Sequence, residues 1–250
     1  MKVCKPFWAG SVICLFLLSC GIEQYHFLPQ VPENRITRIS NTDAEIIIPR
    51  IDRGVFDYAR NYSIFYRIYI SDQLTTGEIT EPQMGNFNPS LLSDYRAIYP
   101  STDQTNTSAT TNVTTLFTNR NFFELEVDGE DIKTNLLSTN GGTLRIHFPT
   151  APGSFPVASL NGGPEFPLRR SGQLVTPFPT DDPFFRNTSE LSDPANATSN
   201  NNADVAGRQG LSQHYAYVSM YIVAAGVNSL FSPIYSKPTH ISIFQLPDAN

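Results

Sequence analysis

The sequence lacks the residue patterns on which many enzyme, redox and metal sites depend. It holds three cysteines in 250 residues, and none follows Cys20, so the rest of the chain can form no internal disulfide and no thiolate metal site. The H-E-x-x-H, G-x-S-x-G, P-loop and C-x-x-C patterns are absent. The four histidines are widely separated and give no local metal-ligand spacing. We therefore assign no catalytic residue from the sequence.

Charged residues and long apolar runs are also scarce. Only 16% of the residues are Asp, Glu, Lys or Arg, and the formal net charge is −6. An acidic chain disfavours nucleic acid and anionic lipid headgroups as partners, because both repel negative charge. A membrane-spanning helix needs roughly 20 consecutive apolar residues, whereas the apolar run at the N-terminus, Phe7–Leu18, has twelve.

The N-terminal segment has the build of an export signal. Lys2 and Lys5 are the only charges among the first nineteen residues, and they precede the apolar run. A positive start followed by about 7–15 apolar residues is typical of a secretory signal peptide. The run ends in Leu17-Leu18-Ser19-Cys20-Gly21. This order, an aliphatic residue three positions before a cysteine and a small residue directly before it, resembles the lipobox of bacterial lipoproteins.

The resemblance implies that residues 1–19 are removed and that Cys20 becomes the first residue of the mature chain. Its thiol would carry a diacylglycerol and its amine an acyl chain, and we expect no other cofactor. A single acyl chain anchors only marginally, whereas two or three hold a protein firmly on a membrane. Gly21, in place of Asp, favours the outer over the inner membrane by the same resemblance. An uncleaved signal anchor and a plain secreted protein are the alternatives.

Beyond a tether at residues 20–41, the composition and the alternation of apolar residues predict a mainly β fold. Asn, Thr, Ser, Pro, Phe and Tyr are abundant, a mix that suits strands and polar loops. We expect residues 42–250 to form a single antiparallel β-sandwich with long loops at about 76–118 and 187–210. Within the first loop, Ser90–Ile98 is predicted to be a short helix capped by Ser90. Strands are predicted at residues 44–48, 62–71, 122–128, 143–148, 214–225 and 239–246.

Two segments together resemble a fibronectin type III module. Phe65–Ser71 is similar to the third strand of that module, and Tyr217–Gly226 with Phe231–Pro238 is similar to its Tyr-x-Tyr-x-Val-x-Ala strand and final hairpin. The resemblance implies an immunoglobulin-like sandwich in which these strands share one sheet. The chain departs from the module in two ways. Its one tryptophan, Trp8, lies in the signal segment, and about 140 residues separate the two segments.

An acidic cluster is the metal candidate. Alternation places Glu124, Glu126 and Asp128 on one face of the predicted strand 122–128 and the apolar residues on the other. Ca²⁺ takes about six to eight oxygen ligands, but the D-x-D-x-D-G order of a dedicated calcium loop is missing. We prefer a solvated strand face that blocks edge-to-edge pairing. His147 alternates with apolar neighbours and is expected to face solvent.

Aromatic residues in a Pro-rich stretch are a candidate binding surface. If exposed, Phe178, Phe184 and Phe185 would form a ligand platform on loops carried by a rigid sandwich. The preferred alternative is that they plug the open end of the sandwich, because large exposed apolar patches are uncommon on soluble domains.

The expected function is that of a membrane-anchored, extracytoplasmic and non-catalytic lipoprotein. It would bind an unidentified protein or glycan, or serve the architecture of the cell envelope. The alternative is an extracytoplasmic hydrolase, directed at glycan or peptide, whose acids come together only in the fold.

Overall fold

The structure is a computed structural model, and it describes most of the predicted domain. The described residues are 28–52, 54–56, 58–75, 77–98, 113–127, 137–149, 151, 154–170, 185, 204–206, 215–227 and 233–246. The signal segment, Cys20, Asp128, Phe178, Phe184 and residues 187–203 lie outside them. No helix in the described ranges is long and apolar enough to span a membrane.

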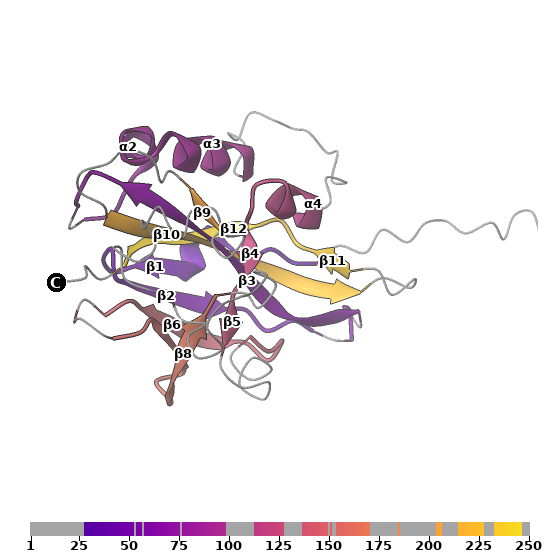
Figure 1. The fold of residues 1–250 in the computed structure, drawn as a ribbon. Coiled ribbons are helices and arrows are strands. Elements are labelled where there is room, and N and C mark those ends of the chain that lie inside the picture. Colours follow the sequence, from indigo (N-terminus) through magenta and orange to yellow (C-terminus); the bar gives the residue numbers. More distant parts are fainter. Residues whose placement is uncertain are drawn as a thin grey trace, which may run out of the picture.

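Two β-sheets packed face to face form the fold, and helices cover the outer face of one of them (Figure 1). The pairs are antiparallel except for the pair of β3 with β9. The predicted antiparallel β-sandwich is therefore confirmed. The first sheet has the order β1 (Ile36–Arg38), β2 (Asp43–Ile48), β6 (Gly142–His147), β7 (Val157–Leu160), β8 (Glu165–Arg169), β5 (Glu126–Val127).

The second sheet is built on two long central strands, β3 (Ala59–Ser71) and β10 (Tyr215–Val227). They pair antiparallel from Ser71 opposite Tyr215 to Ala59 opposite Gly226. These strands contain Phe65–Ser71 and Tyr217–Gly226, the strand segments that resemble the fibronectin type III module, and they are neighbours in one sheet. The flanking strands are short: β11 (Pro233–Tyr235) and β12 (Thr239–Gln245) pair with β10, while β4 (Phe123–Glu124) and β9 (Val205–Ala206) pair with β3.

The sandwich core is formed by the inward faces of both sheets. One face of β3 buries Tyr62, Ile64, Tyr66, Ile68 and Ile70, as the alternation predicts. The first sheet contributes buried apolar residues opposite them, namely Ala44, Ile46, Leu144, Ile146 and Phe148. A core of this extent stabilises the domain without disulfides.

A second apolar core lies on the opposite face of β3 and β10, beneath the helices (Figure 1). The helices are α2 (Glu81–Phe87), α3 (Pro89–Ile98) and α4 (Val113–Thr118), and a short 3₁₀ turn, η1 (Glu33–Arg35), precedes β1. Phe65 of β3 stacks on Phe117 of α4 with 4.4 Å between ring centroids. The second sheet is thus buried on both faces, which explains why its long strands are apolar on both sides.

The start of α3 differs from the sequence prediction. Asn88, not Ser90, caps the helix, because the Asn88 side-chain oxygen accepts a hydrogen bond from the Ser90 amide at 2.8 Å. The amide nitrogen of the same side chain donates to the carbonyl of Ile70 at 2.9 Å. Asn88 therefore fixes the beginning of α3 to the end of β3.

The predicted strand 122–128 is divided between the two sheets, so the prediction of one continuous strand is wrong. The alternation holds within it, because Phe123 and Leu125 pack on the sandwich core while Glu124 accepts a hydrogen bond from Ser63. β4 pairs with β3, whereas β5 pairs with β8 of the other sheet. Between them, the Leu125 amide donates to the Ile64 carbonyl at 2.7 Å, and the Leu125 side chain is buried in the sandwich core. Phe122 is buried in the core beneath the helices. Both cores therefore hold this segment.

The folded domain begins before residue 42, within the predicted tether. Leu28 and Val31 are buried in the sandwich core, and the Thr239 hydroxyl donates to the Val31 carbonyl at 2.5 Å. Arg38 of β1 donates to the backbone carbonyls of His240 and Ile241 at the edge of β12.

Candidate functional site

The acidic residues proposed for calcium lie on strands of different sheets. Glu124 of β4 accepts a hydrogen bond from the Ser63 hydroxyl at 2.9 Å, while Glu126 belongs to β5. Asp128 falls outside the described residues. Among the residues that the structure describes, no group of three His, Cys, Asp or Glu side chains is placed to hold a metal ion. The two described glutamates are half-buried.

Phe185 is a core residue and not part of an exposed platform. Its side chain is 2% exposed, and its ring packs edge-on against Tyr66 and Phe148 with centroids 5.1 and 6.0 Å away. For this residue the alternative that the aromatic rings plug the sandwich agrees with the structure. Phe178 and Phe184 lie outside the described residues.

His147 lies on the outer face of the first sheet beside an acid. Its Nδ1 is 2.9 Å from Oδ1 of Asp43, and Arg145 donates to the same oxygen at 2.8 Å. Burial alone would raise the pKa of Asp43, but the hydrogen bonds and positive charge of Arg145 and His147 outweigh it and lower that pKa. The His147 side chain is about one-third exposed, so it lies at the surface as the sequence predicts.

His240 is buried, with 5% of the residue exposed. Its ring lies between Tyr95 and Tyr221, and Nε2 is 3.5 Å from the Ser219 hydroxyl oxygen. Burial, and then the nearby charge of Arg38, lower the pKa of His240 to about 3. The ring is consequently neutral at physiological pH and packs as part of the structure.

The buried His240 predicts a loss of stability in mild acid. Between pH 6.5 and 3 the unfolded chain binds a proton at this residue and the native chain does not, so the free energy of unfolding falls as the pH falls. We expect a loss of about 2 kcal/mol between pH 7.5 and 5. Urea unfolding at both pH values measures it. His240→Gln should show a smaller loss, and an equal loss in both proteins would contradict the assignment.

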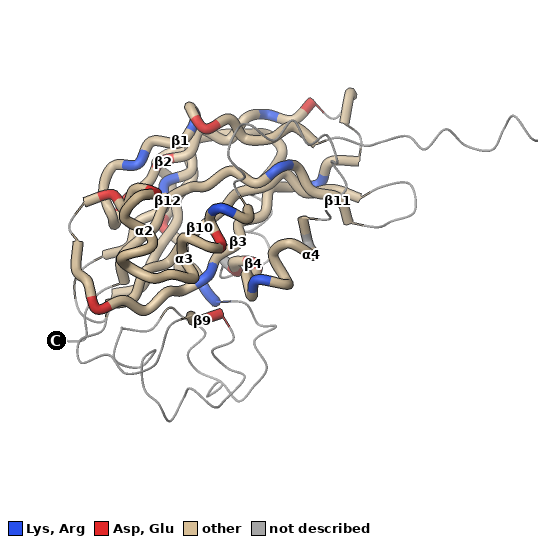
Figure 2. The backbone as a smooth tube through the Cα atoms, turned by 90° about the horizontal axis from the view of Figure 1, so that it is seen from above, with Lys and Arg blue, Asp and Glu red and all other residues tan. Residues whose placement is uncertain are grey.

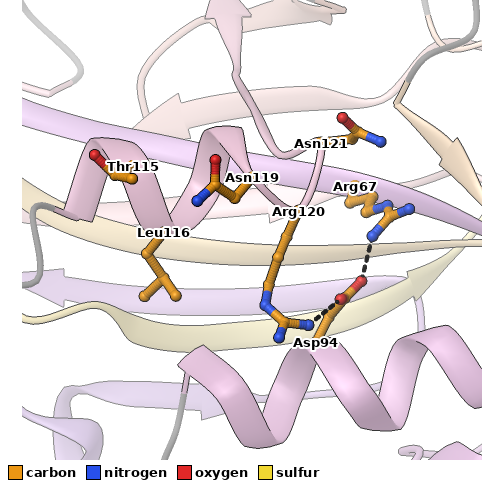
Figure 3. A pocket seen from close by; sticks show the side chains of 7 residues that line it. All are labelled: Arg67, Asp94, Thr115, Leu116, Asn119, Arg120 and Asn121. Atoms are coloured by element: carbon orange, nitrogen blue, oxygen red, sulfur yellow. Dashed lines mark hydrogen bonds and ion pairs between the residues drawn. The ribbon is translucent and has the colours of Figure 1, made fainter.

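A hollow of about 460 Å³ opens between β3, α3 and the end of α4 (Figure 3). Asp94 of α3, whose side chain is 6% exposed, is one of the residues that line it. Arg67 projects toward Asp94 from β3, and Arg120 approaches from the turn after α4 (Figure 3). The remaining lining comes from the same α4 segment and consists of Thr115, Leu116, Asn119 and Asn121.

Both carboxylate oxygens of Asp94 are held by donors. Oδ2 accepts hydrogen bonds from Arg67 Nη1 at 2.5 Å and from the Tyr69 hydroxyl at 2.7 Å. Oδ1 accepts from Arg120 Nη1 at 2.8 Å. Burial, and then the charge of Asp94, raise the pKa of Tyr69, which keeps its hydroxyl protonated as a donor.

The local fold explains how these side chains meet. Arg67 lies between Phe65 and Tyr69 at every second position of β3, and the three residues share the face that the helices cover. The Arg67 guanidinium therefore points into the helical layer. The chain leaves α4 through a turn in which Asn121 has a φ of 54°, a left-handed conformation that Asn tolerates better than most residues. This turn carries Arg120 toward Asp94, while Phe122 returns to the core.

The arrangement is suited to binding a polar or anionic group. Two guanidinium groups face one carboxylate, which leaves an excess of one positive charge in the hollow. Elsewhere in the described chain, acidic and basic residues are interspersed (Figure 2). Asp94 already accepts three hydrogen bonds, which leaves it poorly placed to act as a general base. The hydrolase alternative requires two acids, or an acid and a histidine, and the described lining of this hollow contributes one acid.

This hollow could not be predicted from the sequence. Arg67 stands out as a charge within an apolar strand, but Asp94 and Arg120 follow 27 and 53 positions later. No local spacing connects the three residues.

Comparisons with known proteins add no assignment. No protein-family model, no curated protein and no solved structure matches the chain. Any function must therefore be argued from the residues themselves.

Proposed function

We propose that this protein is a lipid-anchored extracytoplasmic lipoprotein whose β-sandwich acts by binding or in the architecture of the cell envelope, and not by catalysis. The observation that carries the proposal is the order of positive charge, short apolar run and Leu17-Leu18-Ser19-Cys20. Cys20 carries the diacylglycerol and an N-acyl chain. Gly21 directs the protein to the outer membrane.

Cysteine usage supports this anchor. Cys4 and Cys14 fall within the segment that would be removed, and Cys20 is the one cysteine that would remain. A domain with two apolar cores does not need a disulfide for stability, so Cys20 is explained by lipidation alone.

The position of the folded domain also bears on how the protein acts. Leu28 is already part of the core, so the chain from Cys20 to Leu28 places the domain within about 29 Å of the lipid. The domain would therefore lie close to the membrane surface. This geometry suits contact with neighbouring envelope components.

Replacement of Cys20 by Ala is expected to abolish membrane association. The wild-type protein should sediment with membranes, resist washing with high salt and alkali, and be released by detergent, because acyl chains bind through the hydrophobic effect. Cys20→Ala should lose this behaviour. Cell fractionation with immunodetection measures it.

Cys14→Ala is the matched control, because it removes a thiol from the same short segment and should leave anchoring unchanged. A wild-type protein that is found in the soluble fraction, or that is released by salt alone, would contradict the proposal.

A further inference from the structure

We propose that the hollow around Asp94 binds a carboxylated sugar, with the carboxylate against Arg67 and Arg120. The inference rests on the binding role proposed above and names the ligand class of that role. It does not depend on the lipid anchor.

The charge balance of the hollow selects a monoanion. Arg67 and Arg120 carry two positive charges, and Asp94 supplies the one negative charge among the described residues that line the hollow. One further negative charge would complete the balance. A carboxylate meets this need and matches the planar fork of an arginine through paired hydrogen bonds.

The two arginines retain unused hydrogen-bond donors. A guanidinium has five N–H groups. Arg67 uses Nη1 on Asp94. Its Nε lacks a hydrogen-bond partner but is buried and out of a ligand's reach, and within the described residues its Nη2 makes no hydrogen bond. Arg120 uses Nη1 on Asp94 and on the Ser93 carbonyl, and within the described chain its Nε and Nη2 make no hydrogen bond. The donors that can receive ligand oxygens are therefore Nη2 of Arg67 and Nε and Nη2 of Arg120.

The rest of the lining favours a sugar over a peptide carboxylate. Thr115, Asn119 and Asn121 are exposed, and Asn119 and Asn121 flank Arg120 (Figure 3). An amide side chain offers both donors and an acceptor, as neighbouring sugar hydroxyls require. Leu116 is the apolar member of the described lining, which gives a peptide side chain little to pack against. The volume of about 460 Å³ falls in the range of about 300–1,000 Å³ typical of small-molecule sites.

In the first test, saturation-transfer NMR measures the binding of sodium D-glucuronate to the full chain in detergent. D-glucose tests the need for the carboxylate, acetate tests the need for the sugar, and N-acetyl-alanyl-alanine tests a peptide C-terminus. We expect millimolar binding of glucuronate, with each of the other three compounds at least tenfold weaker. No binding of glucuronate would overturn the proposal, as would equal binding of glucose or tighter binding of the dipeptide.

The second test uses matched charge variants. Arg120→Gln should weaken glucuronate binding at least tenfold, while Asp94 keeps its bonds to Arg67 and Tyr69 and preserves the fold. Arg96→Gln is the control, because Arg96 is 62% exposed and pairs with Glu81 outside the described lining of the hollow. Equal effects of the two variants would overturn the proposal.

Asn119→Ala provides a variant without a change of charge. It should weaken glucuronate binding several-fold and leave acetate binding unchanged, because it removes a partner of the hydroxyls only. Unchanged glucuronate binding would place the sugar elsewhere and overturn the proposal. A protein that is acylated at Cys20 but does not bind glucuronate refutes this inference alone. A protein that binds glucuronate without acylation refutes the anchor alone.

Discussion

Asp204→Asn is expected to lower the free energy of unfolding by about 3–5 kcal/mol, the largest effect of a charge change that we foresee. Asp204 and Arg170 form an ion pair in which both side chains are almost fully buried. Arg170 Nε donates to Oδ2 of Asp204 at 2.8 Å, and its Nη2 donates to Oδ1. Burial alone would lower the pKa of Arg170, but Asp204 outweighs it and raises that pKa. Removing the acid therefore leaves the buried Arg170 guanidinium without its carboxylate partner.

The same pair has a clear structural role. Arg170 directly follows β8 of the first sheet, and Asp204 directly precedes β9, which pairs with β3 of the second. The Asp204 carbonyl also accepts the Ile68 amide at 2.8 Å. The pair thus joins the two sheets at one end of the sandwich.

Urea unfolding measures the effect of Asp204→Asn. Glu81→Gln is the control, because the exposed pair of Glu81 and Arg96 should contribute less than about 1 kcal/mol. The double variant Arg170→Met with Asp204→Leu should recover much of the loss, since it removes both buried charges. A loss below about 1 kcal/mol for Asp204→Asn would contradict the buried ion pair.

Asp94→Asn is expected to cost about 2–4 kcal/mol of stability. The substitution removes the negative charge that Arg67 and Arg120 share, and it weakens the acceptor of the Tyr69 hydroxyl. We expect a smaller loss than for Asp204→Asn, because the Arg120 side chain is about one-third exposed and water compensates part of its charge.

The expected consequence is also local, because Asp94 holds α3 against β3. The urea midpoint gives the change in stability, and amide exchange across Pro89–Ile98 shows whether the helix loosens. Arg96→Gln in the same helix should change neither quantity. An Asp94→Asn protein with the wild-type urea midpoint would show that the contacts of Asp94 with Arg67, Tyr69 and Arg120 do not stabilise the fold.

The sandwich could be predicted from the sequence because its main strands alternate. The apolar residues of β2, β3, β6 and β10 recur at every second position or fill both faces. The helical layer was only partly predicted. The outer face of β3 displays Phe65 and Tyr69, but nothing in the strand indicates that α4 and α3 supply their partners.

The candidate sites were harder to predict because they depend on long-range contacts. Glu124 and Glu126 are separated by one residue, yet their strands belong to different sheets, since Leu125 inserts into the core between them. Phe185 is isolated in a Pro-rich stretch, and its burial depends on Tyr66 and Phe148. Such contacts follow from topology and cannot be derived from local spacing.

The intact mass of membrane-extracted protein, with wild type measured beside Cys20→Ala, decides whether Cys20 carries the proposed lipid anchor. We predict a wild-type mass that lacks residues 1–19 and gains two or three acyl chains on a glycerol-modified cysteine, with no such gain in Cys20→Ala. An unmodified wild-type chain, or one with residues 1–19 still attached, would contradict the account.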